Sequence, residues 1–151
     1  MPAAQVRHES GDRFTIEVRG HSFTVDQPVA DGGTNLGPSP TEVFVASLAG
    51  CVGFYGRRFL ARHGLPDDVT VDATWSMATS PSRVGSIRLS VRAPGLPGSL
   101  EPRFAKVIEH CTVHNTLMAP PEVAISIEQE QRSGSEVDLD EASDPVGSLM
   151  P

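Results

Sequence analysis

Apolar and polar residues alternate near the start of the chain, over residues 13–25. Phe14, Ile16 and Val18 are separated by polar residues, which is the period of a half-buried strand. The pair Arg19–Gly20 interrupts the alternation, and a second short apolar run follows it. The pattern predicts two short strands joined by a tight turn at Arg19–Gly20.

The clearest element boundary follows residues 26–38, a loop rich in Gly, Pro and Asn. Ser39 and Glu42 form a capping box around a proline at the first helical position. We expect a helix over residues 40–63, ended by residues 64–66. Its first half is apolar nearly all round, so we expect burial on most sides, at the centre of the fold or in a subunit interface.

The rest of the pattern alternates between strands and helices. We expect strands near residues 68–78 and 83–93, a helix from about Leu100 to His110, a short helical turn at 113–118 and a last strand at 122–128. Cys111 follows Phe104, Val107 and Ile108 at helical spacing, so we expect it on the buried face at the end of the second helix. The order of elements predicts one α+β domain over residues 1–128.

Charge is distributed unevenly along the chain. The formal net charge is −7, and residues 129–151 contribute about −5 of it through six acids and one arginine. This segment has few large apolar residues, so we expect an acidic, disordered tail and a nearly neutral folded part. An acidic chain also argues against nucleic acid as a partner, because phosphate binding needs a basic face.

Targeting and cofactor signals are weak throughout the sequence. The most apolar stretch, residues 43–55, is shorter than a bilayer requires and carries glycines, so we expect no membrane span. The N-terminus lacks a basic segment followed by an apolar one, which argues against a secretory signal and for a cytoplasmic protein. No glycine-rich phosphate loop follows a strand, and we expect no cofactor.

Cys51 and Cys111 are the candidates for chemistry. Two cysteines in an intracellular chain do not suggest a structural disulfide framework. They are therefore buried residues without a chemical role, metal ligands or redox thiols. A metal site is disfavoured, because the adjacent His110 and Cys111 would point about 100° apart on a helix, and only His114 lies nearby. Taken singly, each cysteine fits a small buried hydrophobic residue equally well.

Three motifs taken together resemble the OsmC/Ohr family. Residues 35–55, a Gly/Asn/Pro loop leading into a long helix with a cysteine, resemble its first-cysteine motif. Residues 107–117 resemble its second-cysteine motif, with Thr112 in place of the usual proline. The turn at Arg19–Gly20 resembles the position of its active-site arginine. The resemblance covers about residues 13–128.

The resemblance implies an intertwined α+β homodimer with antiparallel sheets around a long central helix. It also implies a peroxiredoxin-like activity in the oxidative stress response. Cys51 would attack a hydroperoxide, preferably an organic one, and Cys111 would convert the sulfenic acid to a disulfide that an external dithiol reduces. Arg19 would stabilise the thiolate. The alternative is a dimer of the same fold without turnover, which binds small molecules or senses redox state.

Further residues complete the implied site. Apolar side chains near Cys51 would bind the substrate. They are Phe44, Leu48, Phe54 and Tyr55. In peroxidatic members a glutamate ten positions before the reactive cysteine orients the arginine, whereas here Thr41 holds that position and Glu42 follows it. Nine helical steps place Glu42 about 180° from Cys51, so either Thr41 or Glu42 could support Arg19.

Overall fold

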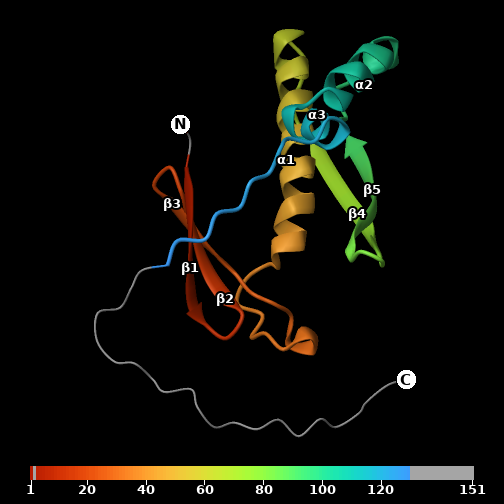
Figure 1. Cartoon of the computed structure of the whole chain (residues 1–151). Helices are drawn as coiled ribbons and strands as arrows, with labels where there is room; N and C mark the ends of the chain where they lie inside the picture. Colours follow the sequence, from red (N-terminus) through yellow and green to blue (C-terminus); the bar gives the residue numbers. More distant parts are fainter. Residues whose placement is uncertain (2, 130–151) are drawn as a thin grey trace, which may run out of the picture. The chain divides into compact units, whose positions relative to one another are not determined.

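The computed structural model of this chain describes residue 1 and residues 3–129 (Figure 1). The chain divides into two compact units, Met1–Pro121 and Glu122–Pro151, and every helix and strand described belongs to the first. The strands are β1 (Ala4–Ser10), β2 (Arg13–Val18), β3 (His21–Val25), β4 (Thr70–Ala78) and β5 (Arg83–Arg92). The helices are α1 (Pro40–Arg62), α2 (Glu101–Glu109) and α3 (Thr112–Met118), with short 3-10 turns at Val29–Asp31 and Gly98–Leu100. Apart from Gln129, the predicted acidic tail lies outside the described residues.

Strands β1, β2 and β3 form an antiparallel sheet in that order. Val18 pairs with His21, which leaves Arg19 and Gly20 as a two-residue turn with φ angles of 50° and 78°. Positive φ at both positions is the property of the type I′ turns that suit strand twist. The predicted hairpin is therefore confirmed. The sequence did not predict β1, because it carries only one large apolar residue, Val6, and owes its conformation to pairing with β2.

The three-stranded sheet has one apolar face that stays largely open. Val6, Ile16 and Phe23 form a cross-strand row on it. Val6 is 57% exposed and Phe23 39%, and Val18 on the next row is 40% exposed. Among the described residues these strands pack extensively only on one another. The apolar side chains on this face of the sheet are therefore largely uncovered by the rest of the unit Met1–Pro121.

Helix α1 begins with the predicted capping box. The Ser39 backbone N–H donates to the Glu42 carboxylate at 2.6 Å, and the Glu42 N–H donates to the Ser39 hydroxyl at 3.3 Å. The helix ends at Arg62, with His63 as its C-cap. One stripe of the helix is buried. It consists of Val45, Leu48, Val52, Gly56, Phe59 and Leu60. Both the boundaries and the capping of this helix are confirmed.

The opposite face of α1 is exposed within one chain, so the expected burial on most sides would require a subunit interface. Phe44 is 38% and Phe54 53% exposed, so the helix is not buried on most sides within this chain. The whole helix of 23 residues, unlike residues 43–55 alone, is long and apolar enough to cross a bilayer by length and composition. Helices at the core of soluble proteins have the same composition, and α1 packs against β4, β5, α2 and α3 (Figure 1).

The hairpin of β4 and β5 and the helices α2 and α3 complete a helical body with α1. Both strands and both helices lie where the sequence predicts them, to within two residues. Two buried clusters hold the body together. One is built on Leu48, Val52 and Cys111, and the other on Phe59, Leu60 and Phe104. The body therefore has a core drawn from all five of its elements.

Residues 122–128 are not a strand in this structure, contrary to prediction. Val123, Ile125 and Ile127 alternate as a strand would, but they are 77%, 88% and 85% exposed. Alternation predicts an amphipathic strand, whereas the strand itself forms only where a neighbouring edge accepts its hydrogen bonds. No strand among the described residues pairs with this segment.

Candidate functional site

Cys51 and Cys111 come from elements 60 positions apart in the sequence and meet in one apolar cluster. Cys51 projects from the middle of α1 and is partly exposed, while Cys111 is fully buried at 0% exposure. Leu48 and Val52 on the adjacent turns of α1 pack with them. Both cysteines are free thiols. A partly exposed thiol thus lies beside a fully buried one, so a reagent in solution can reach the Cys51 sulfur and not the Cys111 sulfur.

Cys111 lies between α2 and α3, and it is buried at the end of the second helix as expected. Its backbone is extended, and it is the N-cap residue of α3. The His114 N–H donates to its sulfur at 3.4 Å, which compensates only in part for the loss of water. Burial raises the pKa of the Cys111 thiol above its usual value, and the neighbouring Cys51 adds to the shift. Cys111 is therefore held as a protonated thiol near neutral pH.

A hydrogen bond joins the two cysteine-bearing segments. The Tyr55 hydroxyl lies 3.1 Å from the Thr112 hydroxyl oxygen. Tyr55 is one helical turn after Cys51, and Thr112 directly follows Cys111. The threonine that replaces the family's proline therefore supplies a polar contact that a proline lacks. The sequence carried only an indirect signal of this bond, namely a hydroxyl residue four positions after Cys51 and another one position after Cys111.

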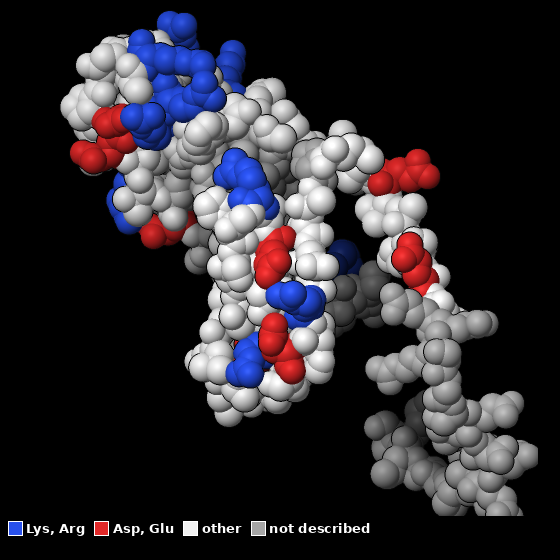
Figure 2. All heavy atoms as spheres, turned by 90° about the vertical axis from the view of Figure 1, so that its left-hand side faces the viewer, with Lys and Arg blue, Asp and Glu red and all other residues white. Residues whose placement is uncertain are grey.

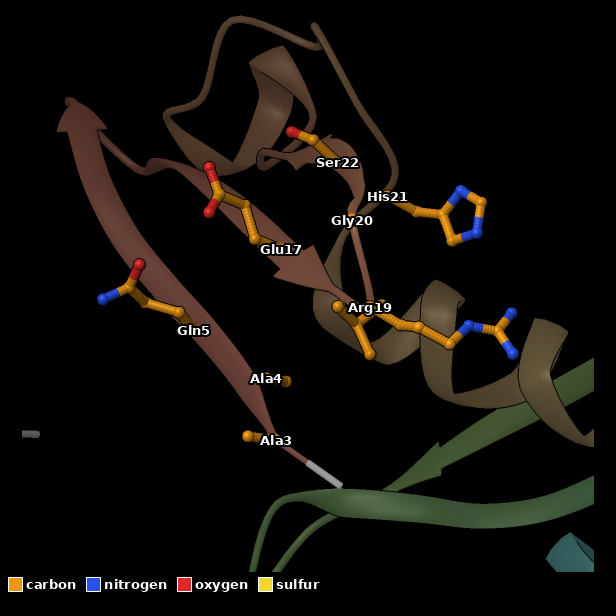
Figure 3. A pocket seen from close by; sticks show the side chains of 9 residues that line it. Ala3, Ala4, Gln5, Glu17, Arg19, Gly20, His21 and Ser22 are labelled. Carbon is orange, nitrogen blue, oxygen red and sulfur yellow. The ribbon is translucent and has the colours of Figure 1, made fainter. Parts of the chain in front are cut away.

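Arg19 lies in the turn between β2 and β3, in a conformation that arginine rarely adopts. Its φ of 50° is in the left-handed region, which costs a residue with a Cβ about 1–2 kcal/mol. Figure 3 shows the Arg19 side chain at a cavity of about 490 Å³ that His21, Glu17 and Gln5 also line. Within the described part of the chain no hydrogen bond or ion pair joins Arg19 to either cysteine. Arg19 therefore holds, at a cost in backbone energy, a turn position that glycine or asparagine would accept more readily.

The Glu42 side chain caps the N-terminus of α1. Its carboxylate accepts the 2.6 Å bond from the Ser39 N–H, and the described residues show no ion pair between Glu42 and Arg19. Thr41 lies next to it, in the first turn of the helix. The structure accordingly gives Glu42 a capping role and does not bring it together with Arg19.

The predicted substrate residues fall into two groups. Phe44 and Leu48 line a cavity of about 310 Å³, and Leu48 also lines one of about 270 Å³ bounded by β5 and α2. His114 borders both cavities. Phe54 and Tyr55 lie further along α1, where their rings meet edge to face at 5.7 Å. The first group is thus the one that lines apolar cavities beside the cysteine cluster.

Asp26, which the sequence analysis missed, organises the loop that leads into α1. It is 1% exposed, and its carboxylate accepts bonds from the N–H groups of Gln27, Thr34 and Leu36 and from the Thr34 hydroxyl. The Thr34 hydroxyl and these N–H groups lower the pKa of Asp26 to about 2. A lone aspartate before a Gly/Asn-rich loop was the available signal.

The histidines around Cys111 bond to the backbone. The His110 Nδ1 lies 2.6 Å from the Lys106 carbonyl, and the His114 Nδ1 bonds to the Glu109 carbonyl. No group of three or more His, Cys, Asp or Glu side chains gathers as metal ligands in residues 1 and 3–129.

Several solved structures share this fold. A Psychrobacter arcticus protein described as osmotic stress induced and part of a detoxification response is 20% identical, with a TM-score of 0.69 over 77% of this chain and 88% of that one. An organic hydroperoxide resistance protein OsmC of Legionella pneumophila is 19% identical, with a TM-score of 0.61 over 78% and 88%. The organic hydroperoxide resistance protein OhrB of Bacillus subtilis is 17% identical, with a TM-score of 0.56 over 80% and 92%.

Comparison with curated proteins finds no match. The family model of OsmC-like proteins matches residues 32–126, a segment that contains α1, both cysteines and the helical body. The match spans more than half of the chain, and the solved structures of OsmC and Ohr proteins agree with it in fold. This chain belongs to the OsmC-like protein family.

Proposed function

We propose that this protein is a thiol-dependent peroxidase that reduces organic hydroperoxides. The observation that carries the proposal is the meeting of a partly exposed Cys51 with a fully buried Cys111 in one cluster. A peroxide can reach only the partly exposed Cys51 sulfur. The buried Cys111 sulfur lies beside it, where it can react with the sulfenic acid that forms on Cys51. The names of the OsmC and Ohr structures fit the same chemistry.

The proposed cycle transfers two electrons from the thiols to the peroxide. The Cys51 thiolate attacks the distal oxygen of ROOH, the O–O bond breaks, and Cys51 becomes a sulfenic acid. The released alkoxide takes up the proton that the Cys51 thiol lost on ionising and leaves as ROH. The Cys111 sulfur then attacks the Cys51 sulfur, a disulfide forms and water leaves. An external dithiol reduces this disulfide by exchange and is itself oxidised. No metal or cofactor takes part in the cycle.

Arg19 is the cation that we assign to the Cys51 thiolate, supplied by a second copy of the chain. A thiol in an apolar helix face ionises poorly unless a positive charge lies close to it. The apolar face of the N-terminal sheet is open, as are Phe44 and Phe54 on α1. We propose a homodimer that covers these faces and brings the turn of one chain to the cysteines of the other.

The remaining assignments follow from the same site. The cavities lined by Phe44 and Leu48 favour an apolar R group on the hydroperoxide. Phe54 and Tyr55 would extend this surface in the dimer. Regeneration by a dithiol suits a reducing compartment, so we propose a cytoplasmic protein of the oxidative stress response.

The decisive experiment counts thiols after one equivalent of cumene hydroperoxide. We expect both thiols to disappear and the mass to fall by that of two hydrogens, because an intramolecular disulfide forms. The Cys111→Ser variant should instead gain one oxygen on Cys51, and the Cys51→Ser variant should keep its remaining thiol. Retention of both thiols in the unmodified protein would exclude the peroxidase, and oxidation of Cys111 in the Cys51→Ser variant would reverse the roles.

One observation favours the alternative of an OsmC-like dimer without turnover. The Glu42 carboxylate accepts the Ser39 N–H in the capping box, and within one chain it makes no ion pair with Arg19 among the described residues. Such a protein would oxidise once and slowly, and it would act as a redox sensor or as a small-molecule binding protein. Steady-state peroxide consumption with excess dithiothreitol separates the two functions, since only the enzyme consumes many equivalents of peroxide per chain.

A further inference from the structure

A basic pocket lies at the C-terminal end of α1, beyond the cysteine pair. Its cavity measures about 450 Å³, and its walls come from α1 and α2. Its charged side chains are Arg58 and Arg62 of α1 and Arg103 of α2. Figure 2 shows Lys and Arg side chains gathered at the end of the molecule where Figure 1 places α2 and the end of α1. Two helices thus bring their arginines to one concave site.

These arginines have no acidic partner among the described residues. The ion pairs there use Arg7, Arg57 and Arg92, and no Asp or Glu lines the pocket. The Arg58 guanidinium lies over the Phe54 ring, 5.2 Å from its centroid, a contact that leaves its N–H donors available. Three like charges around one cavity repel one another unless an anion lies among them.

Helix stability explains only part of this arrangement. Arg62 is in the last turn of α1, where a cation is favoured by the helix dipole. Arg103 is in the first turn of α2, where the dipole disfavours a cation. Arg103 therefore interacts unfavourably with the dipole of α2, and its charge adds to the positive potential at the pocket.

We propose that this pocket binds a small organic phosphate. Guanidinium groups match the oxygens of a phosphate group with paired hydrogen bonds, and a doubly charged phosphate balances several of them better than a carboxylate does. The cavity is in the size range of small-molecule sites, which leaves room for an organic part beside the phosphate. Tyr55, Phe59 and Val107 provide the apolar wall for that part.

This site goes beyond hydroperoxide reduction and requires no peroxide, so its test is independent of the cysteine chemistry. Tyr55 is the only tyrosine of the chain and lines the pocket. Its ring resonances in NMR spectra therefore report binding at this pocket, and phenol controls for an apolar contact with Tyr55 that involves no phosphate.

The probes are phenyl phosphate, inorganic phosphate and phenol, each titrated into the full-length reduced protein. We expect phenyl phosphate to shift the Tyr55 resonances saturably below about 10 mM, a range that corresponds to a weak single site. Inorganic phosphate should bind more weakly, and phenol should not saturate. Replacing Arg62 or Arg103 with Gln should weaken phenyl phosphate binding about tenfold or more, because a charge-assisted bond is lost.

Arg57→Gln is the matched control. Arg57 neighbours Arg58 on the same helix, but it pairs with Asp67 and does not line the pocket. Phenyl phosphate binding to this variant should match the unmodified protein, and circular dichroism should show that all three variants keep their fold. The proposal is overturned if the Tyr55 resonances do not saturate, if Arg57→Gln weakens binding as much as Arg103→Gln, or if phenol binds as well as phenyl phosphate.

Discussion

The helical body and the N-terminal sheet carry different parts of the candidate site, and they are stabilised differently. The body holds Cys51 and Cys111 in a core to which all five of its elements contribute. The sheet holds Arg19 on a strained turn and leaves most of its apolar face open. A thiol pair needs a fixed separation, and a packed core supplies it. The position of the Arg19 side chain relative to the thiols instead depends on what covers the sheet.

The largest effect that this comparison predicts is the separation of activity from stability at Arg19. In Arg19→Asn we expect the rate of Cys51 oxidation to fall about 10²–10³-fold, the usual cost of removing one charge-stabilising donor. Stability should rise by up to about 1 kcal/mol, because asparagine accepts the positive φ of this turn. Stopped-flow oxidation and urea unfolding measure the two effects.

Arg88→Gln controls for the loss of one exposed positive charge on a strand of the body. It should change neither the rate nor the stability appreciably. If Arg19→Asn oxidises as fast as the unmodified protein, the assignment of Arg19 to the thiolate is wrong.

The next effect contrasts the two regions by side-chain truncation. Leu60 is 0% exposed, so Leu60→Ala should cost about 2–5 kcal/mol of unfolding free energy at any protein concentration. Phe23 is 39% exposed within one chain, so Phe23→Ala should destabilise the protein only where the homodimer forms. Urea unfolding at several protein concentrations, with light scattering for the oligomeric state, tests this difference. A concentration-independent loss in Phe23→Ala would argue against the dimer interface proposed for the sheet.

The loop between the regions should respond to acid. The pKa of Asp26 is about 2 in the folded chain, below its usual value of 3.8, so its ionised form stabilises the fold. That contribution is complete above pH 3.8 and is lost as the pH falls from 3.8 through 2. Asp26→Asn should melt at a lower temperature at pH 7 and change less across this pH range. Equal pH profiles for both proteins, from melts monitored by circular dichroism, would contradict the role given to Asp26.

The smallest effects concern the capping box at the start of α1. Ser39→Ala should cost about 1 kcal/mol, since the Glu42 N–H loses its acceptor. Glu42→Gln keeps a side-chain acceptor for the Ser39 N–H, so stability should change little. Peroxidase turnover in Glu42→Gln then decides its role. Unchanged turnover would leave capping as its function, while a loss of tenfold or more would assign it to Arg19.

The sequence by itself determined the elements whose signals are local. The capping box at Ser39 fixed the start of α1, and alternation with the Arg19–Gly20 turn fixed the β2–β3 hairpin. Local signals succeed here because capping bonds and turn conformations involve residues within a few positions of one another. The family resemblance added the fold, and through it the expectation that the two cysteines belong to one site.

Only the tertiary structure decided which residues meet across the chain. It buried Cys111 in one cluster with Cys51, paired β1 with β2, gave residues 122–128 no strand conformation and brought Arg58 and Arg103 to one pocket. The physical reason is the same in each case. Burial, strand pairing and the clustering of charges depend on residues that are distant in sequence. A local sequence pattern does not identify those residues.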